Sequence, residues 1–327
     1  MRQRQFGRTG LQIAELSFGC GSVGGLMVRG ARADRVRAIA RAIEAGVTYF
    51  DTAHAYGDGM SETNLGEVLR ELNPRITVGT KIRVSQSELP NARAVIRAKV
   101  QAGLDRLGLP SVDVLYLHNQ ISESGSADDG VLSADQVLGP VLEGFNDLKA
   151  AGLIRNLGFT GLGDTAGVIK VVDSGAFDVM HTYFNALNPS AAHPVPASFG
   201  AQNLGQMMDR AVARGMGIIA IRILAAGALA GVAPDERGAL AGPVGGSLTA
   251  GGDYGSDLAR TAKLRPIAAE LGISLAELAI RFAITEQRVS SALIGMATVD
   301  QFESAVQAVE GGPLPEAVFK RMLELAA

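Results

Sequence analysis

Four polar residues capable of proton transfer follow three short apolar runs of the sequence. Asp51 ends the first of these runs, and Tyr56 lies five residues further along. Lys81 directly follows the second run, and His118 directly follows the third. If the runs are consecutive parallel strands of a barrel, their carboxyl ends meet at one end of it. The sequence therefore predicts one pocket that contains an Asp, a Tyr, a Lys and a His.

These residue types suit proton transfer at a carbonyl or hydroxyl oxygen. A phenol, with an ordinary pKa of about 10, is a poor acid–base catalyst at neutral pH, and a nearby ammonium favours its phenolate form. Lys81 can supply that charge, and Asp51 can keep Lys81 protonated and in place. His118 can orient the substrate oxygen by a hydrogen bond, while Tyr56 exchanges a proton with it and a hydride moves at the attached carbon.

Each of these residues also has an ordinary structural explanation. An Asp at a strand end often caps a turn, a Lys there is usually solvated, and a buried His is more often a satisfied core residue. The placement of all four after consecutive runs favours the catalytic interpretation.

The elements that must position these residues alternate between short apolar runs and longer amphipathic ones. The short runs lack polar alternation, which is typical of strands buried on both faces. Helical periodicity separates them, and glycines stop several of the helices. Eight strands, each followed by a helix, predict a (β/α)8 TIM barrel. The predicted strands are 16–19, 48–51, 76–80, 112–117, 157–160, 179–182, 218–221 and 292–294.

Three further segments bear on the ends of this barrel. Residues 5–13 predict a small N-terminal hairpin that closes its bottom. Two long loops, 119–135 and 225–256, follow the fourth and seventh strands, and such loops lie at the catalytic, C-terminal face. Because we find no linker, we expect residues 1–327 to form a single domain.

A glycine motif after the first strand offers an alternative fold. Residues 19–24 read Gly-Cys-Gly-Ser-Val-Gly, which matches the G-x-G-x-x-G of a Rossmann unit. In that unit the third glycine lies within the helix that receives the pyrophosphate. The next predicted helix begins only near Asp34, some ten residues late. We therefore interpret the motif as a loop over the barrel mouth.

Four segments resemble the aldo-keto reductase superfamily. Residues 46–57, GVTYFDTAHAYG, are similar to its first signature. Residues 104–108, LDRLG, which lead to His118, are similar to its second. Residues 152–159, GLIRNLGF, and 294–295, IG, agree with later landmarks. The resemblance spans nearly the whole chain, in the family's order.

The resemblance implies an oxidoreductase in which Asp51, Tyr56, Lys81 and His118 form the catalytic tetrad. It also implies a nicotinamide cofactor bound across the carboxyl ends of the strands, without a Rossmann fold and usually without a metal. The cofactor-binding residues that it implies are Thr160, His181, Ile221, Arg222, Leu224, Gly295, Met296, Thr298 and Gln301.

Several of these positions depart from the family pattern. Thr160 and Gly161 stand where Ser-Asn commonly holds the carboxamide of the nicotinamide, and His181 replaces a frequent Gln. Ile221 takes the place of the Tyr that stacks on the ring in many members. Arg222 is unusual in its apolar run, and two roles are open to it: a partner for the cofactor pyrophosphate, or an ordinary partner for a carboxylate such as Asp253 or Asp257.

The segment 295–303 bears on the choice between NAD and NADP. In this family the 2′-phosphate of NADP lies there, and a phosphate normally needs Lys or Arg close by. The segment contains no basic residue and two acidic ones. We therefore expect NAD, with NADP open if Arg222 or Arg288 supplies the missing cation.

Among branches of the family, residues 117–119, 221–227 and 294–298 are most similar to the NAD-dependent sugar 1-dehydrogenases for L-fucose and D-threo-aldoses, and to pyridoxal 4-dehydrogenases. This similarity implies oxidation of an aldose at C1 to a lactone, with Tyr56, His118 and Asn119 at the substrate. Two alternatives stay open: NADPH-dependent reduction of small aldehydes or ketones, and a non-catalytic regulatory subunit, against which the full tetrad argues.

The composition of the 327 residues narrows the partners. The formal net charge is −3, with acidic and basic residues interspersed, which argues against nucleic acid. The N-terminus shows no signal-peptide pattern, no run is long enough for a membrane span, and Cys20 is the one cysteine. We expect a cytoplasmic protein that acts on a small carbonyl or sugar substrate. The sequence does not indicate an oligomeric state.

Overall fold

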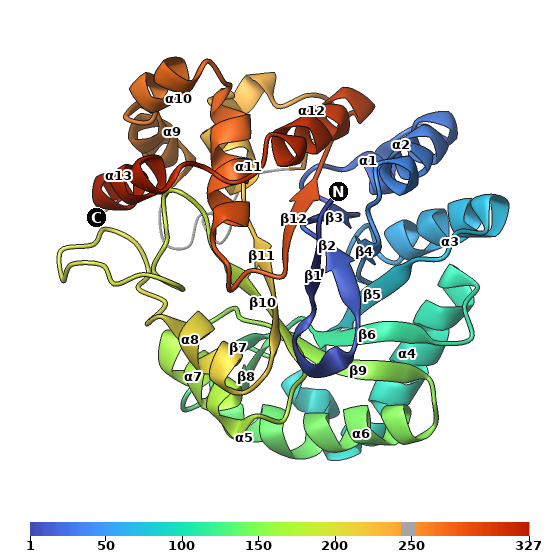
Figure 1. Ribbon diagram of the computed structural model, residues 1–327. Helices are drawn as coiled ribbons and strands as arrows, with labels where there is room; N and C mark the ends of the chain where they lie inside the picture. Colours follow the sequence, from blue (N-terminus) through green and yellow to red (C-terminus); the bar gives the residue numbers. More distant parts are fainter. Residues whose placement is uncertain (243–252, 327) are drawn as a thin grey trace.

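Eight parallel strands form a closed barrel in the computed structural model, which describes residues 1–242 and 253–326 (Figure 1). Their order around the barrel is β10-β11-β12-β3-β4-β5-β6-β9, and surrounding helices complete the predicted (β/α)8 TIM barrel. The barrel strands are β3 (Leu16–Gly19), β4 (Tyr49–Asp51), β5 (Thr77–Ile82), β6 (Val112–Leu117), β9 (Ile154–Thr160), β10 (Val179–Tyr183), β11 (Gly217–Ile221) and β12 (Ser291–Gly295).

All eight predicted strands are present, with differences at some ends. β5 runs on to Ile82, so Lys81 lies within the strand and pairs in register with Tyr116 of β6. β9 begins at Ile154, three residues before the predicted start. The prediction missed this start because Arg155 and Asn156 are polar and break the apolar pattern. Both polar side chains hydrogen-bond to Asp113, at 2.7 and 3.0 Å.

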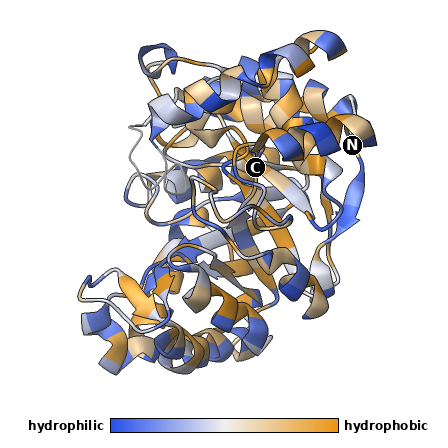
Figure 2. Cartoon of the chain, turned by 90° about the vertical axis from the view of Figure 1, so that its left-hand side faces the viewer, coloured by the Kyte–Doolittle hydropathy of each residue, from blue (hydrophilic) through white to orange (hydrophobic). Residues whose placement is uncertain are grey.

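Helices surround the strands and turn their apolar faces inward (Figure 2). No helix of the described chain has both the length and the apolar character that a membrane span requires. The helices that match predicted ones are α2 (Arg32–Glu44), α3 (Met60–Leu72), α4 (Ala92–Leu107), α6 (Leu142–Ala150), α7 (Thr165–Ser174), α8 (Met207–Ala213), α11 (Leu275–Thr285) and α12 (Val299–Glu310). Five others are α1 (Leu26–Arg29), α5 (Ala134–Gln136), α9 (Tyr254–Ala262), α10 (Arg265–Leu271) and α13 (Glu316–Ala326).

The N-terminal hairpin, strands β1 (Gln3–Gln5) and β2 (Gln12–Ala14), covers the bottom of the barrel as predicted (Figure 1). Phe6 is fully buried there and meets the ring of Tyr49 edge-on, at 5.6 Å between centroids. A Cβ at Gly217 would lie 2.4 Å from the ring of Phe6, so the start of β11 must be a glycine. The barrel is therefore closed below, and its one open end carries the strand carboxyl termini.

Both predicted long loops border that open end. The first contains β7 (Gln120–Ser122) and β8 (Val131–Ser133), a short parallel pair. The described part of the second contains the 3-10 turns η4 (Ala225–Ala230) and η5 (Pro234–Glu236). Its residues 243–252 lie outside the described residues, and the predicted loop gives way to α9 at Tyr254.

Candidate active site

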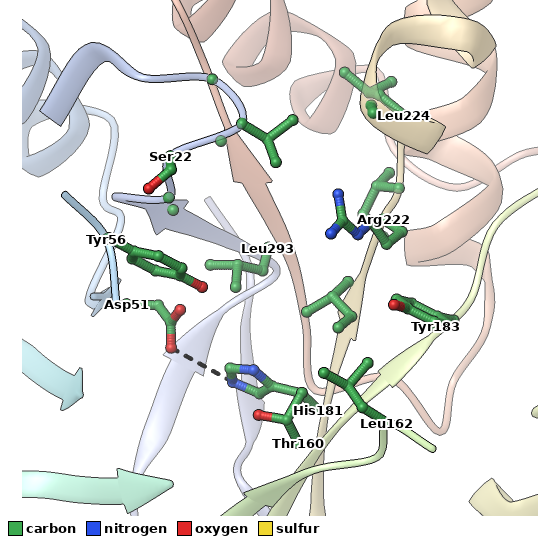
Figure 3. Close-up of a pocket in the computed structure, with 18 of the residues that line it drawn as sticks. Ser22, Asp51, Tyr56, Thr160, Leu162, His181, Tyr183, Arg222, Leu224 and Leu293 are labelled. Atoms are coloured by element: carbon green, nitrogen blue, oxygen red, sulfur yellow. Dashed lines mark ion pairs between the residues drawn. The ribbon is translucent and has the colours of Figure 1, made fainter. Parts of the chain in front are cut away.

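A pocket at the carboxyl ends of the strands brings the four predicted catalytic residues together, and Figure 3 shows Asp51 and Tyr56 within it. Asp51 is the last residue of β4, Lys81 the fifth residue of β5, and His118 directly follows β6. Tyr56 lies in the loop after β4 and projects over the pocket floor. Three consecutive strands of the barrel thus position the four side chains.

Lys81 is the centre of this group. Its side chain is 1% exposed, and its Nζ donates hydrogen bonds to a carboxylate oxygen of Asp51 and to the carbonyl oxygen of Thr52, the latter at 2.8 Å. The same Nζ lies 3.4 Å from the Tyr56 hydroxyl and 4.9 Å from the centre of its ring. A buried ammonium therefore faces the phenol.

The charges of Asp51 and Lys81 depend on each other. Burial raises the pKa of Asp51 to about 6, against the opposite effect of Lys81. Burial lowers the pKa of Lys81, but the Asp51 carboxylate and the Tyr56 hydroxyl more than offset this, so the net pKa lies above its ordinary value. Both groups are consequently ionised at neutral pH, and the ammonium is retained beside Tyr56.

His118 completes the group on the other side of Tyr56. The two rings meet edge-on, 5.7 Å apart at their centroids and at 90°. Burial holds the pKa of His118 well below its ordinary value, and the cations Lys81, Arg83 and Arg222 lower it further. A neutral imidazole has one N–H donor, which suits the orientation of a substrate oxygen. Its Nδ1 is buried and has no hydrogen-bond partner within the described chain.

Ser61 and Glu62, in the first turn of α3, support the site from behind. The Ser61 hydroxyl donates to the carbonyl oxygen of Cys20 at 2.9 Å and lies 2.8 Å from the Thr52 hydroxyl. The buried carboxylate of Glu62 accepts hydrogen bonds from the Thr80 hydroxyl, at 2.5 Å, and from Arg106. These bonds hold the strand ends that carry Asp51 and Lys81.

Thr160 lies deeper in the same pocket. Its hydroxyl is buried without a hydrogen-bond partner in the described chain, and in register it pairs with His181 of β10. Such a group needs a partner, and the amide of a nicotinamide would supply one. The N–H of Gly161 is already used, because it donates to the carbonyl oxygen of His181 at 2.8 Å.

Arg222 extends over the upper part of the pocket (Figure 3). It hydrogen-bonds to Tyr183, and its backbone has a φ of 62°, a strained value for a residue other than glycine. The alternative of a carboxylate partner is wrong. Asp253 caps α9, Asp257 lies 3.8 Å from Arg260, and no acidic group of the described chain comes within 4.0 Å of the guanidinium.

The remaining predicted cofactor contacts divide into two groups. Ile221, Leu224, Gly295, Met296 and Gln301 line the pocket. Thr298 does not; its hydroxyl caps α12 by accepting from the Gln301 N–H at 3.2 Å. The predicted contact of Thr298 with the cofactor is therefore not supported, since the side chain already serves the helix end.

Arg288, one of the two cations proposed for NADP, lies elsewhere. It pairs with Glu286 at 2.7 Å and with Asp209 at 2.6 Å, and it is not among the residues of the pocket. It is therefore unsuited to a 2′-phosphate.

Asn119 also differs from its prediction as a substrate-binding residue. The side chain is 1% exposed and points away from the pocket. Its oxygen accepts from the Val84 N–H at 2.9 Å, and its nitrogen donates to the carbonyls of Val84 and Gly130 at 2.7 and 3.0 Å. These bonds join two loops, so Asn119 supports the rim of the site and has no group free for a substrate.

The glycine motif after β3 borders the pocket as a loop. α1 begins at Leu26, earlier than the expected helix start near Asp34, but it has only four residues. The Rossmann alternative is excluded because β3 belongs to the closed eight-stranded barrel. A Cβ at Gly24 would lie 2.5 Å from the backbone of Met296, and one at Gly21 would lie 3.8 Å from the ring of Tyr56. Gly24 therefore allows close packing of two loops, whereas a Cβ at Gly21 would make only an ordinary contact with the phenol ring.

Tyr183 and Arg83 are among the pocket residues that sequence reasoning missed. Tyr183 is the last residue of β10, one position beyond the predicted strand end, and 7% of it is exposed. Arg83 directly follows β5, and its positive charge lowers the pKa of His118. The sequence offered two signals for them: a Tyr at the end of a barrel strand, and an Arg two residues after Lys81.

The chain belongs to the Aldo/keto reductase family, whose model matches residues 15–327. Members of this family are oxidoreductases that use nicotinamide cofactors. The match agrees with the barrel and with the order of the segments that resemble the family.

Individual relatives have low sequence identity to this chain. L-galactose dehydrogenase from Arabidopsis thaliana is 28% identical over 312 residues, with 94% of this chain and 87% of the relative covered. Pyridoxal 4-dehydrogenase from Microbacterium luteolum is 26% identical over 340 residues, with 93% and 92% covered. A solved aldo-keto reductase from Bacillus halodurans, in its holo form, is 22% identical, has a TM-score of 0.76 and aligns over 100% of this chain and 97% of that one. That last likeness concerns the fold.

Proposed function

We propose that this enzyme oxidises the C1 hydroxyl of an aldose in its ring form, of the L-fucose or D-threo type, to a lactone with NAD. The observation that carries the proposal is the buried Lys81, held between the Asp51 carboxylate and the Tyr56 hydroxyl. The two dehydrogenase relatives, one of which is named for L-galactose, support the sugar substrate and the oxidative direction.

Each residue has a defined part in this reaction. The neutral His118 donates a hydrogen bond to the C1 oxygen and orients it. Tyr56, as a phenolate beside the Lys81 ammonium, accepts the proton of that hydroxyl, and the C1–O bond becomes a carbonyl as C1 loses its hydride. When bound, a nicotinamide dinucleotide supplies the hydride acceptor. The Thr160 hydroxyl and the residues Ile221, Leu224 and Gly295 would hold it.

The preference for NAD is part of the proposal. Asp300 and Glu303 lie on the first turns of α12, and Arg41 pairs with Glu303 at 2.7 Å. Gln301 is exposed and lines the pocket at the place where a 2′-phosphate would need a cation. The absence of a basic residue from segment 295–303 supports NAD.

A turnover panel tests the proposal. Initial rates would be measured with L-galactose, L-fucose, D-arabinose and pyridoxal, each with NAD and with NADP, and in reverse with small aldehydes and NADPH. The proposal expects the highest kcat/KM for an aldose with NAD. Turnover confined to aldehydes with NADPH would show a reductase instead, and no turnover with any pair would favour a regulatory role.

A further inference from the structure

His181 lies against the carboxylate of Asp51, on the side opposite Lys81. Its Nε2 is 3.5 Å from Asp51 Oδ2, the contact drawn as a dashed line in Figure 3. Both side chains are 1% exposed. Neither of the two atoms has a standard hydrogen bond within the described chain. The two atoms therefore face each other with no other hydrogen bond in the described chain.

The imidazole ring is held in this orientation by its surroundings. Its backbone pairs with Thr160 of β9 and Ile219 of β11, and its carbonyl oxygen accepts from the Gly161 N–H. The Tyr116 ring lies below it, 4.1 Å away between centroids and tilted by 41°. The ring therefore has little freedom to turn away from Asp51.

The charge state of His181 follows from the groups that face it. These are Asp51 of β4, Lys81 of β5, Tyr116 of β6 and His118 beyond it. Burial holds the pKa of His181 well below its ordinary value, and Lys81 and His118 lower it further. The imidazole is therefore neutral and carries one N–H donor.

The proton must lie on Nε2. An ionised carboxylate only accepts hydrogen bonds, so a lone pair of Nε2 facing Oδ2 would repel it. A contact of 3.5 Å is longer than a standard hydrogen bond, and catalytic hydrogen bonds are often long in the free enzyme and tighten when substrate binds.

We propose that His181 is a positioning residue whose neutral Nε2–H donates to Asp51 Oδ2. This hydrogen bond leaves Asp51 Oδ1 directed at Lys81 and so fixes the ammonium that faces Tyr56. This role differs from the cofactor contact that the family resemblance implies for this position. Its kinetic consequence rests on the proposed function, whereas its effect on Asp51 does not.

The first test needs no activity. Thermal unfolding would be followed in the cofactor-free protein for wild type, His181→Leu and His181→Gln at about pH 8 and about pH 5. Asp51 has a raised pKa of about 6, and loss of the donor raises it further. The resulting loss of stability is complete at a pH above the raised pKa, where Asp51 is ionised, and disappears as the pH falls below about 6.

The expected result is a Tm deficit of His181→Leu that is larger at the higher pH by about 2 °C, which corresponds to a shift of roughly one pKa unit. His181→Gln keeps an amide N–H at a similar reach, so its deficit should not depend on pH. A Leu deficit that is equal at both pH values would show a purely packing role and overturn the proposal.

The second test separates Asp51 from the cofactor. NADH affinity, from the fluorescence of the dinucleotide, should change less than about threefold in either variant, since the proposed partner of His181 is Asp51. The lower apparent pKa of the kcat/KM profile should rise by about one unit in His181→Leu and be restored in His181→Gln. A tenfold loss of NADH affinity with an unchanged pH profile would instead assign His181 to the cofactor.

Discussion

Tyr56 is partly exposed, whereas Lys81 and Asp51 behind it are almost completely buried. This arrangement lets a substrate reach the phenol while the ion pair stays buried away from water. The electrostatic field of a charge is stronger in the low-dielectric interior than in water. At the scale of residues, the proposed reaction depends on that separation between an accessible proton carrier and a buried charge.

Lys81→Met tests the role of the buried charge. Without the ammonium the phenolate is no longer favoured, so oxidation should fall by about 10²-fold or more, and the remaining activity should have its optimum at higher pH. The pH dependence of kcat/KM measures both effects. Lys99→Met, which removes a surface partner of Glu88, is the matched control. An unchanged pH optimum of the remaining activity would show that Lys81 does not act on Tyr56.

Thr160→Val tests the predicted contact with the cofactor. The change keeps the shape of the side chain and removes the hydroxyl that is buried without a partner. Loss of one hydrogen bond, about 1 kcal/mol, should weaken NADH binding by roughly fivefold in a fluorescence titration. Thr182→Val, whose hydroxyl contacts the sulfur of Met207 outside the barrel, is the control. Equal affinities for wild type and Thr160→Val would exclude this contact.

At the scale of elements, the sequence predicts the strands and most barrel helices because each has its own periodicity. The start of β9 is missed because Arg155 and Asn156 turn polar side chains to Asp113 at the lower rim. α9, α10 and α13 are missed because they lie outside the strand–helix alternation. α8 begins at Met207, since Gln206 adopts a left-handed conformation.

In the site, too, the sequence predicts some contacts and misses others. Asp51, Tyr56, Lys81 and His118 are brought together as the motif spacing predicts. Asn119 follows His118 directly but turns the other way, and sequence adjacency cannot reveal which side of the rim a loop residue faces. The contact of His181 with Asp51 depends on two strands on opposite sides of the barrel, which no local pattern encodes.

Gln301→Arg tests the place of the adenosine end of the cofactor. The residue is exposed on the first turn of α12 and lines the pocket, whereas Met296 is 3% exposed and a cation there would be buried. We expect kcat/KM with NADP to rise by about fivefold or more relative to NAD. Gln307→Arg, on the same helix but outside the pocket, should give no gain. Equal cofactor ratios in both variants would mean that the 2′-phosphate binds elsewhere.

At the scale of the whole molecule, the hairpin and the site lie at opposite ends of the barrel. Arg4 fastens the hairpin from below by a salt bridge to the buried Glu15 at 2.6 Å. It also donates to the carbonyls of Glu286 and Val289, at 3.0 and 2.7 Å. Stability and chemistry should therefore be separable by mutation.

Arg4→Met should lower stability without affecting catalysis. It leaves a buried carboxylate with one partner fewer, at a cost of about 2–3 kcal/mol, so Tm should fall by roughly 3–4 °C. Arg2→Met, which removes the more exposed partner of Glu15, should cost less than about 1 kcal/mol. Values of kcat/KM well below the Tm should stay as in wild type. A loss of turnover at full folding would show that the two ends of the barrel are coupled.

Tyr56→Phe measures the central claim most directly. The variant keeps the ring and removes only the hydroxyl that exchanges the proton. With the best aldose of the panel and NAD, we expect kcat to fall by about 10²–10⁴-fold. NADH affinity, measured by fluorescence on the same preparation, should stay within about twofold of wild type. Retention of most of the wild-type kcat by Tyr56→Phe would contradict the assignment of Tyr56 as the acid–base residue of this site.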